Sequence, residues 1–364
     1  PNIIEFIVAQ FGILRAGLVA TYTNDRLAID EAVRQLTLAE AKVVITTSER
    51  AEALRAFSGM IDVRMIVASG DVAPDGMMLL STIVSADLSG SFSLEASTDS
   101  DALLRFTSGT SGEPKGALVT HRAWITRAVH LLAELVRIEE ESMVLCPGPI
   151  THAAGLLILP GFLRTGTLVL MRKFYASEIG KIAEALPIRY GMFVPTMIKM
   201  ILNEPSAVDK LRKSSMQQIS YGGSPIPSSV LADALDRLSP ITFVQSYGSH
   251  EAGTMSYLDE FDHKSLKLLE SAGKPVLNVD IRIDPIEGQR FGELLVRTPW
   301  SSNASVVVKG KREERDSWVR TGDLGEMRDG YLFLMERLND VIVTGSFNVY
   351  PGEVERCISH YPGI

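Results

Sequence analysis

Hydrophobic and polar positions follow two alternating patterns over most of the chain. Short apolar runs bounded by turn residues predict buried strands, and they occur at 43–46, 102–106, 143–146, 167–171, 190–194, 218–221 and 242–245. Stretches with a hydrophobic period near 3.6 residues predict helices, at 3–18, 28–41, 122–137, 177–186 and 228–238. Alternating strands and helices indicate parallel sheets covered by helices. We therefore predict an α/β fold with parallel sheets flanked by helices.

The pattern changes near residue 274, where helical periodicity stops. Short strands joined by turns are predicted at 279–283, 292–296, 305–308, 318–320 and 331–335, followed by a strand at 340–344 and a helix from Pro351. This pattern is typical of a small β-rich unit. The predicted organisation is α/β subdomains over 1–273, a β-rich subdomain over 274–337, and a hinge with the start of another domain over 338–364.

The hydrophobic content and net charge of the chain limit the kinds of partner to be expected. With 364 residues, 46% of them hydrophobic, and a net charge of −8, the chain is typical of a globular protein rather than a disordered one. The acidic balance argues against nucleic acid or an anionic membrane as the main partner. No uncharged apolar run reaches the roughly 20 residues of a transmembrane helix. A homo-oligomer is left open.

Cysteine usage predicts the redox compartment. The chain contains two cysteines, Cys146 and Cys357, and no CxxC motif. A disulfide framework is therefore not expected, and a reducing cytoplasm is predicted.

A segment rich in glycine and hydroxyl residues follows the predicted strand at 102–106. Residues 107–116 read TSGTSGEPKG, with three glycines, four hydroxyl residues and Lys115. Such a loop can direct backbone N–H groups and a positive charge at an anion. A flexible surface loop would need neither the hydroxyls nor the lysine, so we favour a phosphate-binding loop.

The usual motifs of several other enzyme classes are missing. Lys115 is followed by Gly116 rather than Ser or Thr, which excludes Walker A, and the loop is not GxGxxG. Residues 222–226 lack the last glycine of GxSxG, and Thr254 stands where HExxH needs its second histidine. Dehydrogenase, serine hydrolase and zinc protease functions therefore lose their usual support.

The loop at 107–116 resembles the signature loop of the adenylate-forming superfamily. This superfamily contains acyl- and aryl-CoA synthetases (AMP-dependent synthetases and ligases), adenylation domains of peptide synthetases and luciferase-like enzymes. Further segments resemble its other motifs in the expected order: LRAG at 14–17, HAAG at 152–155, YGGSP at 221–225, YGSHE at 247–251, RTGDLG at 320–325 and ERLNDVIVTGSFNVYPGEVE at 336–355. The resemblance covers essentially the whole chain, and the motifs are jointly specific.

The resemblance implies a two-step reaction. A carboxylate attacks the α-phosphate of ATP and releases pyrophosphate, and a thiol such as that of coenzyme A then displaces AMP. Two like unit charges 4 Å apart repel by about 4 kcal/mol at an effective dielectric constant of about 20. The site must therefore supply backbone N–H groups, a lysine and Mg²⁺ as positive potential.

The resemblance also assigns roles to individual residues. Those implied to bind phosphate are Thr107, Ser108, Gly109, Thr110, Ser111, Gly112, Lys115 and His250. Gly222, Gly223 and Ser224 are implied to line the adenine pocket, with Tyr247 stacking on the base. Gln245, Ser246 and Gly248 are implied to bind ATP or AMP. Asp323 is implied to bind the ribose, and Arg337 the ribose and phosphate. Mg²⁺ is assigned to Glu251 with Thr110, and the acyl pocket to His152, Tyr221, Ser249 and Met255. Lys115, Glu251 and His152 are the candidate catalytic residues, and Asn339 is the hinge.

Taken singly, several of these residues have ordinary alternatives. Tyr247 alone would suggest core packing, Glu251 a solvated carboxylate, and Asp323 after Gly322 a turn former. Only the surrounding motifs raise the functional interpretation above them.

The sequence departs from the superfamily at several positions. His250 and Asn339 replace the usual threonine and the usual Asp or Lys, and Val343 and Ser346 also differ. The last lysine is Lys311, so the catalytic lysine of the mobile C-terminal domain has no counterpart. We therefore expect a catalytic body with a truncated C-terminal lid, lacking the segment before LRAG, and with impaired turnover.

The favoured function is an ATP-dependent acid–thiol ligase that forms an acyl-adenylate and passes the acyl group to coenzyme A. Two alternatives stay open: an aminoacyl-adenylating domain of a peptide synthetase, and a non-catalytic module that binds nucleotide or acyl-AMP. The sequence does not distinguish fatty, aromatic and alicyclic acids.

Overall fold

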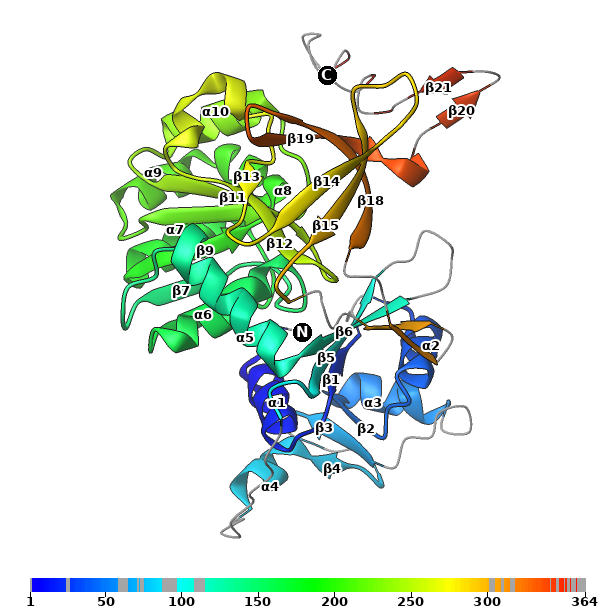
Figure 1. Ribbon diagram of the computed structural model, residues 1–364. Helices are drawn as coiled ribbons and strands as arrows, with labels where there is room; N and C mark the ends of the chain where they lie inside the picture. The colour runs from blue at the N-terminus through cyan, green and yellow to red at the C-terminus, as the bar shows by residue number, and fades with distance from the viewer. Residues whose placement is uncertain are drawn as a thin grey trace. The chain divides into compact units, whose positions relative to one another are not determined.

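A computed structural model provides the arrangement of the helices and strands (Figure 1). It describes residues 2–23, 27–57, 65–70, 72, 75–86, 97–107, 115–300, 305–308, 311–314, 318–340, 342–344, 347–349, 351, 354 and 358. The chain divides into one unit of Pro1–Trp124 with Asn303–Arg315, and a second of Ile125–Ser302 with Asp316–Ile364.

The first unit contains two sheets. Its helices are α1 (Ile4–Arg15), α2 (Ile29–Leu38), α3 (Ser48–Arg55) and α4 (Leu80–Ser85). Its strands are β1 (Ala20–Tyr22), β2 (Val43–Thr47), β3 (Met65–Ser69), β4 (Met78–Leu79), β5 (Asp101–Thr107), β6 (Lys115–Thr120), β16 (Ser305–Val308) and β17 (Lys311–Glu314). β2, β3 and β4 form a parallel sheet. Val33 and Leu36 of α2 and Leu54 of α3 are buried with Val44 of β2, so the two helices cover this sheet.

The larger sheet of this unit is mixed, in the order β1-β5-β6-β16-β17. β5 and β6 form an antiparallel hairpin, and only β1 pairs with β5 in parallel. β16 comes from about 190 residues further along the chain, and Val306 pairs with Ala117 of β6. The expectation that 305–308 joins the β-rich strands is therefore wrong. A short β-branched run fits any open sheet edge, and its sequence does not specify which edge it meets.

Helix α5 (His121–His130) crosses the boundary between the two units. The other helical segments of the second unit are η1 (Leu131–Leu135, π-helical), η2 (Ala153–Leu157), α6 (Ile158–Leu163), α7 (Ala176–Ala185), α8 (Pro195–Leu202), α9 (Pro205–Lys213), α10 (Ser228–Arg237), η3 (Asp262–Lys264), η4 (Leu266–Leu268) and η5 (Leu338–Asp340). Its strands are β7 (Met143–Cys146), β8 (Thr167–Leu170), β9 (Ile188–Phe193), β10 (Gln218–Gly222), β11 (Thr242–Ser249), β12 (Gly253–Leu258), β13 (Lys274–Pro275), β14 (Asp280–Pro285), β15 (Gly292–Arg297), β18 (Val319–Arg328), β19 (Tyr331–Arg337), β20 (Ile342–Thr344) and β21 (Phe347–Val349).

A seven-stranded sheet in the order β13-β12-β11-β10-β9-β7-β8 is the centre of the second unit (Figure 1). The five strands from β11 to β8 are parallel, as predicted. Leu145 of β7 belongs to the core that α7, α8, α9 and α10 form over one face. A Cβ built on Gly161 of α6 would lie 3.7 Å from Cγ2 of the neighbouring Val144. Successive side chains of a strand point to opposite faces, so α6 covers the other face.

A separate antiparallel sheet follows in the order β14-β15-β18-β19. It joins the seven-stranded sheet where Ala272 N–H donates to the carbonyl of Leu332 and Leu332 N–H donates to that of Gly273, both at 2.7 Å. Tyr247 of β11 packs against the shared cluster of Ala272, Leu294 and Leu332. The predicted fold class, an α/β body with a β-rich part, is confirmed.

Candidate active site

The carboxyl ends of β10 and β11 bring together residues predicted to bind ATP or AMP. In the parallel register Tyr221 pairs with Gln245 and Gly222 with Ser246. A Cβ on Gly222 would lie 2.2 Å from the carbonyl oxygen of Ser246, so only glycine fits there. Gly223 follows with φ +86, and Ser224 is exposed beside it. Ligands of open α/β sheets bind outside the carboxyl ends of the strands, which is this edge.

Three predicted nucleotide-binding residues meet between the two sheets of the second unit. The Tyr247 hydroxyl donates to Asp323 Oδ2 at 2.5 Å, and Arg337 Nε lies 3.3 Å from Asp323 Oδ1. The register that pairs Asp323 with Arg337 fixes the second contact. Burial and the neighbouring Asp323 carboxylate raise the pKa of Tyr247, so its hydroxyl stays protonated as a donor at neutral pH.

The predicted magnesium ligand Glu251 lies at the tip of the β11–β12 hairpin. Ser249 pairs with Gly253, which leaves a three-residue loop of His250, Glu251 and Ala252. Ser249 Oγ accepts from the Ala252 N–H at 3.0 Å. Gly248 lies within the hairpin, where a Cβ would stand 2.2 Å from the carbonyl of Gly253.

Two residues outside the hairpin hold this loop, and sequence reasoning missed both. Arg127 Nη1 and Nη2 donate to the carbonyls of His250 and Glu251 at 3.1 and 2.7 Å, and Trp300 Nε1 donates to that of Ala252 at 2.5 Å. Arg127 lies 123 positions from His250. A polar residue on a predicted helix gives no signal of such a contact.

The predicted acyl-gating histidine and the unusual histidine of the YGSHE motif are neighbours. The ring centroids of His152 and His250 are 6.2 Å apart at an interplanar angle of 62°. His152 precedes η2 and is exposed, and its Nδ1 lies 2.8 Å from Thr151 Oγ1.

The other residues predicted for the acyl pocket are more enclosed. Tyr221 and Met255 are fully buried, and Ser249 is half-buried. The Tyr221 hydroxyl donates to Gln245 Oε1 at 3.1 Å and lies 3.0 Å from His263 Nε2. Tyr221 thus connects the core to Gln245, and its contact with an acyl chain stays a prediction.

The predicted phosphate loop belongs to the first unit. Thr107 ends β5 and pairs with Lys115 at the start of β6, so the loop closes an antiparallel hairpin. Ser108, Gly109, Thr110, Ser111 and Gly112 lie outside the described residues, as do the side chains of Thr107 and Lys115. The predicted hinge residue Asn339 is exposed within η5.

The chemistry of Glu251 fits a magnesium ion shared with phosphate. Mg²⁺ is usually held by one or two carboxylates together with substrate phosphates and water. The backbone carbonyls of 250–252 are already hydrogen bonded, so the side-chain carboxylate of Glu251 is the group at this loop that would bind Mg²⁺. Among the described residues, no group of three or more His, Cys, Asp and Glu forms a separate metal cluster.

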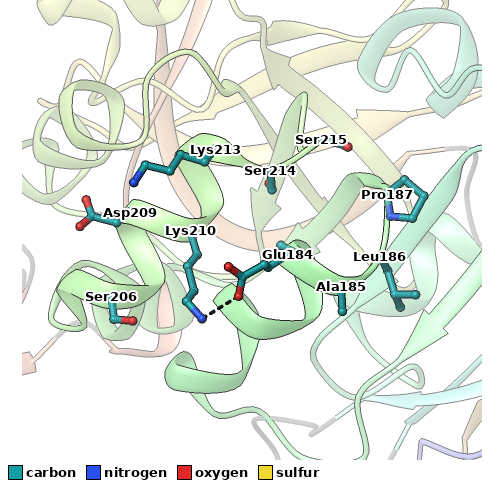
Figure 2. Close-up of a pocket in the computed structure, with 11 residues that line it drawn as sticks. Glu184, Ala185, Leu186, Pro187, Ser206, Asp209, Lys210, Lys213, Ser214 and Ser215 are labelled. Atoms are coloured by element: carbon teal, nitrogen blue, oxygen red, sulfur yellow. Dashed lines mark hydrogen bonds and ion pairs between the residues drawn. The ribbon is translucent and has the colours of Figure 1, made fainter.

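A surface cavity of about 730 Å³ lies elsewhere in the second unit (Figure 2). Glu184 of α7 forms an ion pair with Lys210 of α9 across it, with Nζ and Oε2 2.7 Å apart. Pro187 precedes β9 and Ser215 precedes β10. The cavity therefore lies at the amino ends of the strands, at the opposite edge from Gly222.

A protein-family model and several known proteins match the sequence of this chain. The model of the AMP-binding enzyme family matches residues 1–304. Feruloyl-CoA synthase from an Amycolatopsis species is 30% identical over 379 residues, which span 100% of this chain and 72% of that enzyme. The medium/long-chain-fatty-acid–CoA ligase FadD8 of Mycobacterium tuberculosis is 33% identical over 270 residues, 72% of this chain and 47% of that enzyme.

Solved structures of other enzymes superpose on the fold of this chain. A fatty acyl CoA synthetase of M. tuberculosis superposes with a TM-score of 0.80 at 25% identity, covering 100% of this chain and 72% of that one. O-succinylbenzoate CoA synthetase (MenE) of Bacillus subtilis, in complex with ATP and magnesium ion, has a TM-score of 0.80 at 24% identity, covering 100% and 73%. The latter likeness concerns the fold alone.

The fold and the residues at its sheet edge define an adenylate-forming ligase. The chain belongs to the AMP-binding enzyme family. The predicted ATP-dependent acid–thiol ligase, acting through an acyl-adenylate, is confirmed, and the alternatives are not favoured. Within the described part of the chain, every helix is too short or too polar to span a bilayer.

Proposed function

We propose that the second unit holds the nucleoside of ATP at Tyr247, Asp323 and Arg337, and that an aromatic or fatty acid is activated beside it. The observation that carries this proposal is the meeting of these three side chains from two different sheets. The names of the relatives, a feruloyl-CoA synthase and a fatty-acid ligase, support an acid with an apolar body.

Asp323 has the capacity to bind a ribose as well as its two protein partners. A carboxylate offers about four lone pairs on two oxygens. Tyr247 takes one on Oδ2 and Arg337 takes one on Oδ1. The remaining lone pairs suit the two hydroxyl donors of a ribose, and the neutral tyrosine ring beside them offers a stacking face for adenine.

The other predicted site residues would bind Mg²⁺, the phosphates and the reacting carboxylate. Glu251 would bind Mg²⁺, which shields the phosphate charges from the attacking carboxylate. Lys115 and the loop 107–112 would supply further positive potential to the phosphates. His152 and His250, as adjacent rings, would flank the reacting carboxylate. The reducing cytoplasm predicted from the two cysteines is consistent with this role.

The test measures binding and turnover separately. Isothermal calorimetry with AMP and with a non-hydrolysable acyl-AMP analogue measures binding. Pyrophosphate release over a panel of aromatic, medium-chain and long-chain acids measures activation. Asp323→Asn keeps the shape but removes the charge, and it should weaken AMP binding by about tenfold or more, because hydrogen bonds to charged groups contribute roughly 1.5–3 kcal/mol.

Asp280→Asn provides the matched control. Asp280 is an exposed carboxylate on β14 of the same sheet, ion-paired with Arg297 at 2.7 Å. This variant should bind AMP like the wild type. Equal AMP affinity in the wild type and in Asp323→Asn would contradict the assignment of the ribose site.

A further inference from the structure

The three carbonyls at the tip of the β11–β12 hairpin are all bonded by side chains from outside the hairpin. The guanidinium of Arg127 in α5 spans His250 and Glu251, and the indole of Trp300 reaches Ala252. A three-residue loop usually exposes its carbonyls to water and moves with little restraint. Here, each carbonyl has a donor fixed elsewhere in the fold.

The donors themselves are immobilised. Trp300 is only 5% exposed, and its ring stacks edge-on against His130 with centroids 4.8 Å apart. Arg127 and His130 belong to the same helix, so α5 supports both donors. The guanidinium is a rigid fork whose two N–H groups can bond neighbouring acceptors at once.

Gly253, the first residue after the loop, leaves room for both donors. Gly253 has φ +70, a conformation that glycine adopts readily. A Cβ there would lie 2.9 Å from both Arg127 Nε and Trp300 Nε1. The glycine thus allows both the guanidinium and the indole to approach this turn closely.

We propose that Arg127, assisted by Trp300, is a positioning residue that fixes Glu251 for Mg²⁺ binding. Arg127 bonds the carbonyl of Glu251 itself, so it restrains the torsions from which the carboxylate side chain projects. A catalytic group must be held within about 0.5 Å of its productive geometry. This inference rests on the proposed role of Glu251 as the magnesium ligand.

The main variants are Arg127→Gln, Arg127→Lys and Trp300→Phe. Glutamine keeps a single amide donor group without the charge, and lysine keeps the charge without the planar fork. Phenylalanine keeps an aromatic ring against His130 but loses the indole N–H. Arg122→Gln is the matched control, because Arg122 lies on the same helix, exposed and paired with Asp99.

The first measurement is hydrogen exchange of the peptide covering 245–258. Arg127→Gln and Trp300→Phe should speed exchange at 250–253 by about tenfold, the equivalent of losing roughly one net hydrogen bond. Exchange in β10 and β9 should stay within twofold. Unchanged exchange at 250–253 in Arg127→Gln would overturn the proposed restraint.

The second measurement is the Mg²⁺ concentration for half-maximal pyrophosphate release at saturating ATP and acid. It should rise about tenfold in Arg127→Gln, the fold-change of a loss near 1.4 kcal/mol, while KM for the acid changes less than twofold. Arg127→Lys should recover only part of the Mg²⁺ dependence, and Arg122→Gln should match the wild type. A uniform fall in kcat with an unchanged Mg²⁺ requirement would show a merely structural role.

The two proposals fail in different ways. A wild-type chain that binds neither AMP nor the acyl-AMP analogue would count against the proposed function, and the exchange measurement would still decide whether Arg127 restrains the loop. An active wild type whose Mg²⁺ requirement is unaffected by Arg127→Gln would refute the positioning role alone.

Discussion

The hydroxyl of Tyr247 contributes to the site in a different way from its ring. The ring packs against the cluster of Ala272, Leu294 and Leu332, whereas the hydroxyl donates to Asp323. Replacing Tyr247 with phenylalanine separates the two contributions. The ring would keep the face that we propose stacks on adenine, and Asp323 would keep its ion pair with Arg337.

We expect Tyr247→Phe to raise KM for ATP by about three- to tenfold, because Asp323 loses the donor that orients it, an indirect effect of about 1 kcal/mol. Tyr247→Ala should raise it by about a hundredfold, since the stacking face is lost as well. Steady-state pyrophosphate release at varied ATP measures both. Tyr175→Phe, at an exposed tyrosine preceding α7, is the control. Equal effects of the Phe and Ala variants would contradict a stacking role.

For individual residues, the sequence motifs predicted which side chains come together at the candidate site. They did not predict the residues that hold the β11–β12 loop in place. Tyr247, Asp323 and Arg337 belong to segments that read as motifs, and the structure brings them together. Arg127 and Trp300 belong to no motif, because their contacts are with backbone carbonyls. Any residue sequence in the loop offers a carbonyl, so such a contact leaves no residue type to recognise.

Among the elements, Lys274 of β13 joins three segments that are separate in sequence. Its Nζ lies 3.2 Å from both Asp259 Oδ2 and Asp262 Oδ2, and the Tyr331 hydroxyl of β19 donates to Asp262 Oδ1 at 2.7 Å. Burial alone would lower the pKa of Lys274, but the hydrogen bonds to the two aspartates outweigh it, and the pKa is raised. For Asp259, burial opposes but does not offset the backbone and lysine hydrogen bonds, so its pKa is lowered.

Lys274→Met should lower the free energy of unfolding by about 1 kcal/mol at neutral pH, a value reduced by the partial exposure of the pair. A lowered Asp259 pKa stabilises the fold above the unfolded value near 3.9, and this is lost as the pH falls through the lower folded value. A raised Lys274 pKa stabilises below the unfolded value near 10.4, and this is lost as the pH rises through the higher folded value. Urea unfolding of both proteins at several pH values measures the difference.

The difference in the free energy of unfolding between the wild type and Lys274→Met should therefore be largest between about pH 5 and 10. It should narrow at either extreme. Lys267→Met, at an exposed lysine of η4, should show no such gap. If this difference in unfolding free energy is the same at about pH 3 as at about pH 7, its dependence on the ionised Asp259 carboxylate would be refuted.

Helices and strands with a clear hydrophobic pattern could be predicted from the sequence, whereas the pairing of β6 with β5 and with β16 could not. The five parallel strands of the second unit follow from short apolar runs between helices. β6 was not predicted, because 115–120 directly follows the glycine-rich segment and precedes α5 without a turn signal. Its antiparallel hairpin with β5 replaced the expected parallel arrangement there.

For the molecule as a whole, β16 ties a late segment of the chain to an early sheet. β16 lies between β6 and β17, so its N–H groups face a neighbour on both sides. Proline in such a strand removes a ladder hydrogen bond wherever it falls. Valine to threonine keeps both the N–H and the β-branched backbone preference.

We expect Val306→Pro to destabilise the first unit by about 3 kcal/mol while the second keeps its stability. Hydrogen exchange should speed up across β5 and β6 but not across β9 and β10. Val306→Thr should leave both units unchanged. Uniform acceleration in Val306→Pro would mean that the two units unfold as one.

The late arrival of β16 has a consequence for synthesis of the chain. About 190 residues separate Ala117 from its partner Val306, so β6 leaves the ribosome long before its neighbour. At roughly 5–20 residues per second, the β6 edge waits about 10–40 s for that strand. During this time an open strand edge can pair with other nascent chains. Slower translation should therefore lower the yield of soluble protein, and co-expressed chaperones that cover strand edges should restore it.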